Sequence, residues 1–64
     1  MKRRDFERHI RLCGCVLVRE GAKHSVYKNP ETNISATVAR HTEIYPRMVQ
    51  AICKQLDIST PRGK

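Results

Sequence analysis

The residue best placed for chemistry in this sequence is His24, which follows a short turn and begins a segment that alternates polar and apolar residues. An imidazole titrates near neutral pH, so it can take or give a proton during catalysis. RNA carries its own nucleophile in the 2′-hydroxyl, and one histidine among cations would therefore form a minimal ribonuclease site without metal. On position alone, an ordinary strand-end histidine is the simpler interpretation of His24.

Positive charge surrounds His24 and dominates the composition. Arg19, Lys23 and Lys28 lie close to it in the sequence and are expected to supply phosphate-binding cations. In the whole chain, 13 Lys and Arg oppose 6 Asp and Glu, which gives a formal net charge of +7. Because such a protein attracts polyanions, nucleic acid is the first expected partner, before an acidic protein or an anionic membrane surface.

Other polar residues are candidates for contact with RNA. His41 follows the third predicted strand and could bind phosphate or act as a second proton-transfer group, although a lone loop histidine is more simply a surface residue. Tyr27 could stack on a base or fill the core, depending on strand register, and His9 is expected to be solvated. The predicted RNA-binding set is Lys2, Arg3, Arg4, Arg19, Lys23, Ser25, Lys28, Arg40 and His41.

Other classes of site lack the residues they need. The three cysteines and three histidines form no CxxC or HxxxH pair, whereas structural zinc sites use closely paired ligands. The sequence has no P-loop, no GxSxG motif and no paired carboxylates. A chain of 64 residues buries only a thin core, so an internal cofactor cavity is not expected. We therefore predict a site without metal or cofactor.

The sequence also gives no sign of a membrane segment or of disulfides. The uncharged runs 12–18 and 33–39 are far shorter than the roughly 20 apolar residues of a membrane-spanning helix. The basic residues near the start are followed by Asp5 and Glu7, so a signal peptide is not expected. Three cysteines, an odd number, fit reduced thiols. We expect a cytoplasmic protein with no membrane partner.

Apolar periodicity predicts two helices. The first covers residues 2–13, where Phe6, Ile10 and Cys13 form one stripe, and Gly14 is suited to end it in a left-handed conformation. The second begins near Tyr45 with a proline in its first turn, and its apolar face comprises Val49, Ile52, Cys53 and Leu56.

Three strands are predicted between these helices, over residues 15–19, 24–28 and 34–40. The first two form a hairpin whose turn contains Gly21, a residue free to take positive φ. If Glu20 and Lys23 flank that turn, Arg19 faces His24 and Leu17 faces Val26. His24 would then share a sheet face with Leu17 and Val26 while still reaching solvent beside the turn.

The order α-β-β-β-α predicts an α+β fold of the double-stranded-RNA-binding-domain type. A three-stranded antiparallel sheet with one half-apolar face needs a cover, and two amphipathic helices on that face provide it. Residues 1–58 are predicted to form a single domain. Residues 59–64 lack apolar side chains and are predicted to be a flexible C-terminal tail.

Three stretches of the sequence resemble the HicA family of toxin–antitoxin mRNA interferases. They are residues 2–6 with the helix that leads to Gly14, the strand–turn–strand segment 17–27, and residues 38–44 with the helix that follows. The segment Gly21-Ala22-Lys23-His24 is the most specific part of the resemblance. Two departures, Ala39 where many relatives have Pro and Arg47 where many have Gly, affect local geometry and charge outside that segment.

The resemblance implies a toxin that cleaves mRNA independently of the ribosome with the histidine at position 24, and thereby inhibits translation and growth. A metal-free histidine site predicts attack by the 2′-hydroxyl, which leaves a cyclic phosphate and a 5′-hydroxyl. The resemblance also implies a HicB-type antitoxin that covers this surface, with a monomeric toxin inside the larger complex. The alternatives are a non-catalytic basic RNA-binding module and a docking domain for an acidic protein, for which fold and charge suffice.

Overall fold

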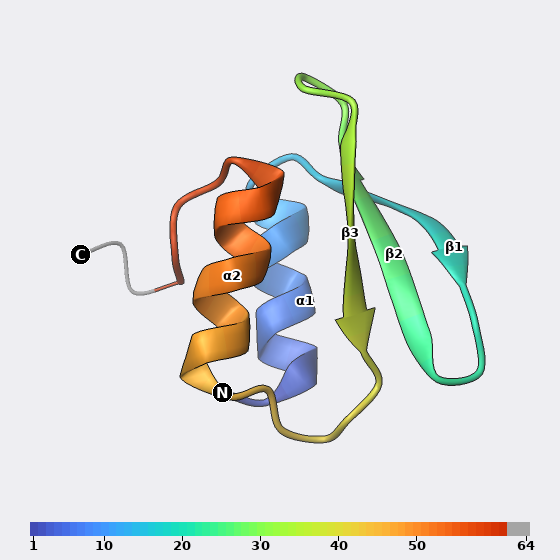
Figure 1. The fold of residues 1–64 in the computed structure, drawn as a ribbon, viewed down its shortest axis with the longest axis vertical. Helices are drawn as coiled ribbons and strands as arrows, with labels where there is room; N and C mark the ends of the chain where they lie inside the picture. Colours follow the sequence, from blue (N-terminus) through green and yellow to red (C-terminus); the bar gives the residue numbers. More distant parts are fainter. Residues whose placement is uncertain (62–64) are drawn as a thin grey trace.

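The computed structural model describes residues 1–61, which form five elements in the order α1 (Arg3–Leu12), β1 (Val16–Glu20), β2 (His24–Asn29), β3 (Ile34–Ala39) and α2 (Pro46–Leu56). The strands pair antiparallel in the order β1-β2-β3, and both helices lie on the same side of the sheet (Figure 1). This arrangement confirms the predicted order and the α+β class. No helix among residues 1–61 has the length and apolar character needed to span a membrane.

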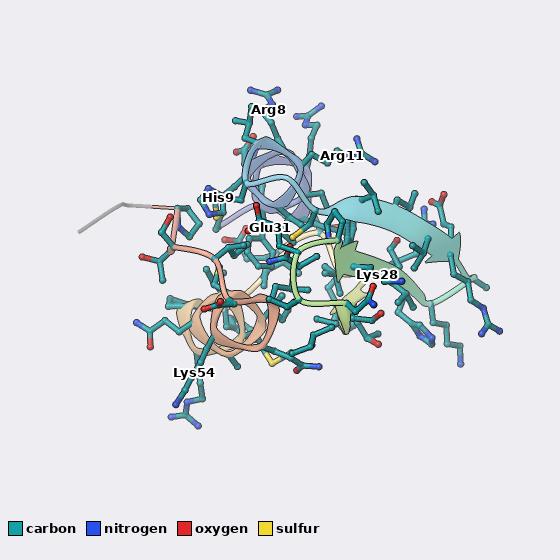
Figure 2. The ribbon with its side chains drawn as sticks, turned by 90° about the horizontal axis from the view of Figure 1, so that it is seen from above. Arg8, His9, Arg11, Lys28, Glu31 and Lys54 are labelled. Atoms are coloured by element: carbon teal, nitrogen blue, oxygen red, sulfur yellow. The ribbon has the colours of Figure 1, made fainter. Side chains whose placement is uncertain are left out.

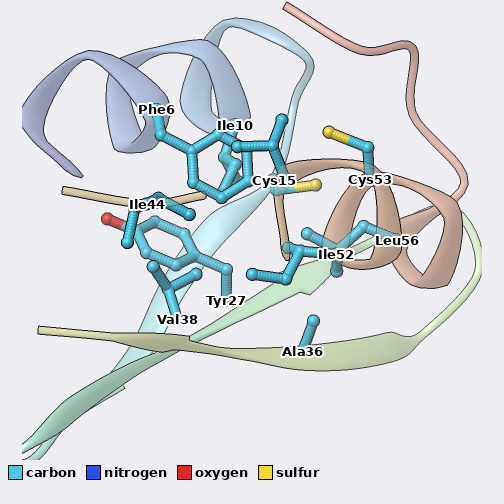
Figure 3. Close-up of a cluster of buried hydrophobic side chains, with 11 residues drawn as sticks. Phe6, Ile10, Cys15, Tyr27, Ala36, Val38, Ile44, Ile52, Cys53 and Leu56 are labelled. Atoms are coloured by element: carbon cyan, nitrogen blue, oxygen red, sulfur yellow. The ribbon is translucent and has the colours of Figure 1, made fainter. Parts of the chain in front are cut away.

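The core fills the space between the two helices and the sheet (Figure 3). Phe6 and Ile10 of α1 are fully buried there, in agreement with the predicted apolar stripe. Tyr27 of β2 is also fully buried, and its hydroxyl donates a hydrogen bond to Glu7 Oε1 at 2.6 Å. Of the two roles open to Tyr27, the structure therefore selects the core. The buried face of α2 comprises the four residues predicted for it, Val49, Ile52, Cys53 and Leu56.

The ends of the helices depend on local backbone conformation. Gly14 has φ of 95°, and its N–H donates to the carbonyl of Arg11 at 3.0 Å, so its predicted role at the end of α1 is confirmed. Pro46 occupies the first position of α2, where its missing N–H has no helical partner to lose. At the other end of α2, Asp57 adopts a left-handed conformation with φ of 58°.

The register of the hairpin differs from the predicted one. Glu20 pairs with Ser25 rather than with Lys23, so Arg19 pairs with Val26. The ladder then shifts by one residue at a bulge between Leu17 and Arg19, so Leu17 pairs with Tyr27. Directly paired residues lie on the same face of a sheet, and a slip of one residue moves a side chain to the other face. Leu17 therefore lies on the helix side with Tyr27, and the prediction that His24 shares a face with Leu17 was wrong.

The last described residues return to α1. The Nε2 atom of His9 donates a hydrogen bond to the carbonyl oxygen of Ser59 at 2.7 Å, and His9 is half-buried rather than solvated as expected. The flexible tail predicted over 59–64 falls partly on residues 62–64, which lie outside the described residues.

Burial distinguishes the three cysteines. Burial, with a smaller effect of the neighbouring thiols, raises the pKa of the Cys15 thiol and raises that of Cys53 to about 11, whereas Cys13 is only half-buried. The thiolate is the reactive form, so we expect iodoacetamide at about pH 8 to modify Cys13 in the folded protein and to spare the other two. Mass spectrometry of the digested protein would show this. Equal modification of all three thiols before denaturant is added would contradict it.

Candidate active site

His24 begins the central strand at the end of the sheet where the hairpin turn lies. It is exposed and pairs with Ala39 of β3. Side chains alternate along β2, so Ser25 and Tyr27 are buried toward the helices, whereas His24 and Lys28 lie on the opposite side of the sheet. We call this side, which faces away from both helices, the outer face.

Two of the predicted cations share the outer face with His24. Arg19 pairs with Val26, the outward position next to His24 on β2, and Lys28 is the following outward position. Arg19 is exposed and Lys28 is half-buried. A phosphate that meets the His24 imidazole on the outer face therefore lies on the same surface as a guanidinium and an ammonium group, both of which stabilise negative charge on oxygen.

The turn that precedes His24 is held at both ends. The N–H of Gly21 donates to the carbonyl of His24 at 2.8 Å, and the N–H of Arg40 donates to the carbonyl of Lys23 at 3.0 Å. The guanidinium of Arg40 pairs with the Glu20 carboxylate, and its Nη1 atom lies 3.5 Å from the carbonyl oxygen of Gly21. Arg40 thus connects the end of β3 to both sides of the turn and fixes the backbone from which His24 projects.

Gly21 is favoured in the turn for a reason other than the predicted one. Among the described glycines, positive φ occurs at Gly14 and not at Gly21. A Cβ atom at Gly21 would lie 3.3 Å from the carbonyl oxygen of His24, which is already the acceptor of the Gly21 N–H. The close approach of these two backbones, rather than a left-handed conformation, is what favours glycine in the turn.

Ser25 and His41 are among the residues of the predicted set that lie away from the outer face. Ser25 is 2% exposed and points toward the helices, so its side chain does not share the surface of His24. His41 lies in the loop that follows β3, where it lines a shallow pocket of about 270 Å³ together with Tyr45 and Met48. Its proposed proton-transfer role stays a prediction.

The cations near the start of the chain lie at the same end of the molecule as the turn, but on the helix side (Figure 1). The backbone of Lys2 forms an isolated bridge with Glu43, and the N–H of Arg3 donates to the carbonyl of Thr42 at 3.0 Å. The side chains of Arg3 and Arg4 line a cleft beside Glu20. Arg19 and Lys28 on the outer face are therefore separated from Arg3 and Arg4 on the helix side.

Glu20 is the site residue that sequence reasoning missed. The Glu20 carboxylate pairs with the guanidinium of Arg40, which is 20 positions away in the sequence, and no local motif links the two residues. Arg40 was predicted to contact RNA, whereas in the structure it pairs with Glu20 across the turn. Within residues 1–61, no group of three or more His, Cys, Asp or Glu side chains is arranged to hold a metal ion.

Comparison with known proteins gives one family match. A family model described as the HicA toxin of bacterial toxin-antitoxin matches residues 3–58, a range that includes both helices, all three strands and His24. Neither the curated proteins nor the solved structures gave a match.

Proposed function

Because the chain belongs to the HicA toxin family of bacterial toxin–antitoxin systems, we propose that it is a ribosome-independent mRNA endoribonuclease with His24 as its catalytic residue. The observation that supports this proposal is the position of His24, an exposed imidazole at the end of the central strand. Arg19 and Lys28 lie on the same face, and the protein carries a formal net charge of +7. An accessible proton-transfer group among cations matches the chemical needs of RNA cleavage.

In the proposed reaction, the 2′-oxygen of one nucleotide forms a bond to the adjacent phosphorus, and the bond from phosphorus to the 5′-oxygen of the next nucleotide breaks. The His24 imidazole either accepts the proton of the 2′-hydroxyl or donates a proton to the departing 5′-oxygen, and water makes the other transfer. The products are a 2′,3′-cyclic phosphate and a 5′-hydroxyl. Arg19 stabilises the negative charge that develops on the phosphoryl oxygens, and Lys28, four residues from His24 along β2, adds to the positive potential of the face.

The proposed partner is an antitoxin of the HicB type that covers the outer face. That face is cationic around His24 and also presents apolar side chains, Val16 at 48% exposure and the half-buried Val26. Exposed apolar groups within a charged surface are typical of a protein interface. An acidic antitoxin bound there would bury these side chains and block access of mRNA to His24, with one toxin chain in each such interface.

The experiment that tests the proposed function uses the purified protein and a long single-stranded RNA in the presence of EDTA. We expect cleavage, and we expect a single 2′-O-methyl group at a mapped cleavage position to abolish cutting there, because that group removes the nucleophile. Neighbouring positions in the same RNA are the internal control. If the RNA binds but stays intact, the non-catalytic RNA-binding module becomes the better account. If cutting persists at the methylated position, the 2′-hydroxyl mechanism is wrong.

A further inference from the structure

A second polar feature lies near the hairpin turn, on the side of the sheet that carries the helices. It is a cleft of about 240 Å³ between α1, the end of β1 and the residue that follows β3. We call it the arginine cleft, and its lining residues are Arg3, Arg4, Glu7, Arg11, Glu20 and Arg40. Neither the outer face nor His24 contributes to it.

The arginine cleft has an excess of positive charge. Both carboxylates of the cleft already have partners. Glu7 accepts a hydrogen bond from the Tyr27 hydroxyl, and its Oε2 atom lies 3.9 Å from Arg3 Nε. Glu20 pairs with Arg40. The other two arginines, Arg4 and Arg11, form no ion pair within residues 1–61. Four guanidinium groups against two carboxylates leave a net charge of +2 around this open cleft. Such a cleft favours a bound anion, which would relieve the repulsion among the arginines.

We infer that the arginine cleft binds a backbone phosphate of the RNA substrate, at a distance from the phosphate that reacts at His24. This inference rests on the proposed role of RNA as substrate. A guanidinium group forms two parallel hydrogen bonds with phosphate oxygens, so a cluster of arginines suits a phosphodiester. The guanidinium carbon of Arg11 lies 5.8 Å from the centroid of the buried Tyr27 ring, a cation–π contact that favours its orientation along the cleft.

The position of the cleft relates it to His24. Arg40 lines the cleft, and its backbone N–H is bonded to Lys23, the residue before His24. The turn thus has the arginine cleft on its helix side and His24 on its outer side. An RNA strand that passes around this end of the sheet would meet both. The cleft would hold the strand by its backbone, independently of base sequence, while the bond to be cut lies at His24.

Binding of a 2′-O-methyl RNA oligonucleotide at several salt concentrations tests this inference, because that RNA cannot be cleaved. The test variant is Arg4→Gln and the matched control is Arg8→Gln. Both residues are exposed on α1 and each substitution removes one charge, but only Arg4 lines the cleft. Figure 2 shows the control residue Arg8 on the same helix, α1, as the cleft residue Arg11. We expect Arg4→Gln to reduce the slope of log affinity against log salt by roughly 0.7–1, as for one lost phosphate contact, and Arg8→Gln to reduce it much less.

Each result decides one point. If the two variants have the same affinity and the same salt slope, the cleft holds no phosphate and its arginines act only as general surface charge or contact an acidic protein. Arg11→Gln is a second test variant, and it should reduce the salt slope by about as much as Arg4→Gln does. If the Arg4 effect is present but unmodified RNA is never cut, the cleft is confirmed as an RNA site and the proposed nuclease function fails. If RNA is cut and Arg4→Gln matches Arg8→Gln, the nuclease stands and this inference is wrong.

Discussion

Replacing His24 with alanine is expected to lower the rate of RNA cleavage by about 10²–10⁴-fold, the usual contribution of a general acid or base. The fold should be unaffected, because His24 is exposed and its hydrogen bonds to Gly21 and β3 use only backbone atoms. RNA affinity should also change little, since the cations of the outer face and of the arginine cleft remain. The measurement is the single-turnover cleavage rate in EDTA, together with the affinity for 2′-O-methyl RNA and the thermal midpoint.

Thr37→Ala is the control for His24→Ala. Thr37 is exposed and pairs with Val26, so it lies on the outer face close to His24 but has no titratable group. The Thr37→Ala protein should cut RNA at nearly the wild-type rate.

His41→Ala tests whether a second imidazole takes part in catalysis. A loss of cleavage rate comparable with that of His24→Ala would identify His41 as the other proton-transfer group. Cleavage by His24→Ala at the wild-type rate would show that His24 is not catalytic.

Replacing Phe6 with alanine is expected to unfold a large fraction of the protein. Phe6 is fully buried between α1 and the sheet (Figure 3), and truncation of a buried Phe costs about 3–5 kcal/mol in free energy of unfolding. A domain of this length has a total stability of only about 3–10 kcal/mol, because small domains bury little surface. The loss is therefore comparable with the whole stability. Urea unfolding followed by far-UV circular dichroism would measure it.

Leu12→Ala is the matched control for Phe6→Ala. Leu12 is also an apolar residue of α1, but 80% of it is exposed, so its truncation leaves no cavity. We expect the urea midpoint of Leu12→Ala to stay close to that of the wild type. A Phe6→Ala protein as stable as Leu12→Ala would mean that the core between α1 and the sheet is not the main source of stability.

Much of the fold could be predicted from the sequence because it depends on local pattern. The stripe of Phe6 and Ile10 identified α1, and Gly14 was correctly expected to end that helix in a left-handed conformation. Proline at the first position of α2 marked the start of that helix. In each case, the periodicity of side chains or the restricted φ of a single residue determines the structure, and both are visible in neighbouring residues.

The hairpin register was predicted incorrectly because it depends on where the turn closes and on a bulge. The turn closes with Glu20 opposite Ser25, which places Arg19 opposite Val26, and one unpaired residue near Val18 then moves Leu17 to the helix side. The sequence favours strands on both sides of the bulge, and neither the composition nor the alternation of β1 marks its position. The pairing is selected by the buried side of β2, where Tyr27 must fill the core.

The sequence by itself determined the element order, the excess of basic residues and, through its family resemblance, His24 as the candidate catalytic residue. Only the tertiary structure decided which cations share a surface with His24, and it separated Arg19 and Lys28 on the outer face from Arg3 and Arg4 on the helix side. It also paired Arg40 with Glu20. The physical reason is that charge and periodicity are properties of the local sequence. The neighbours of a side chain across a sheet, or between a helix and a turn, depend instead on register and on packing between distant segments.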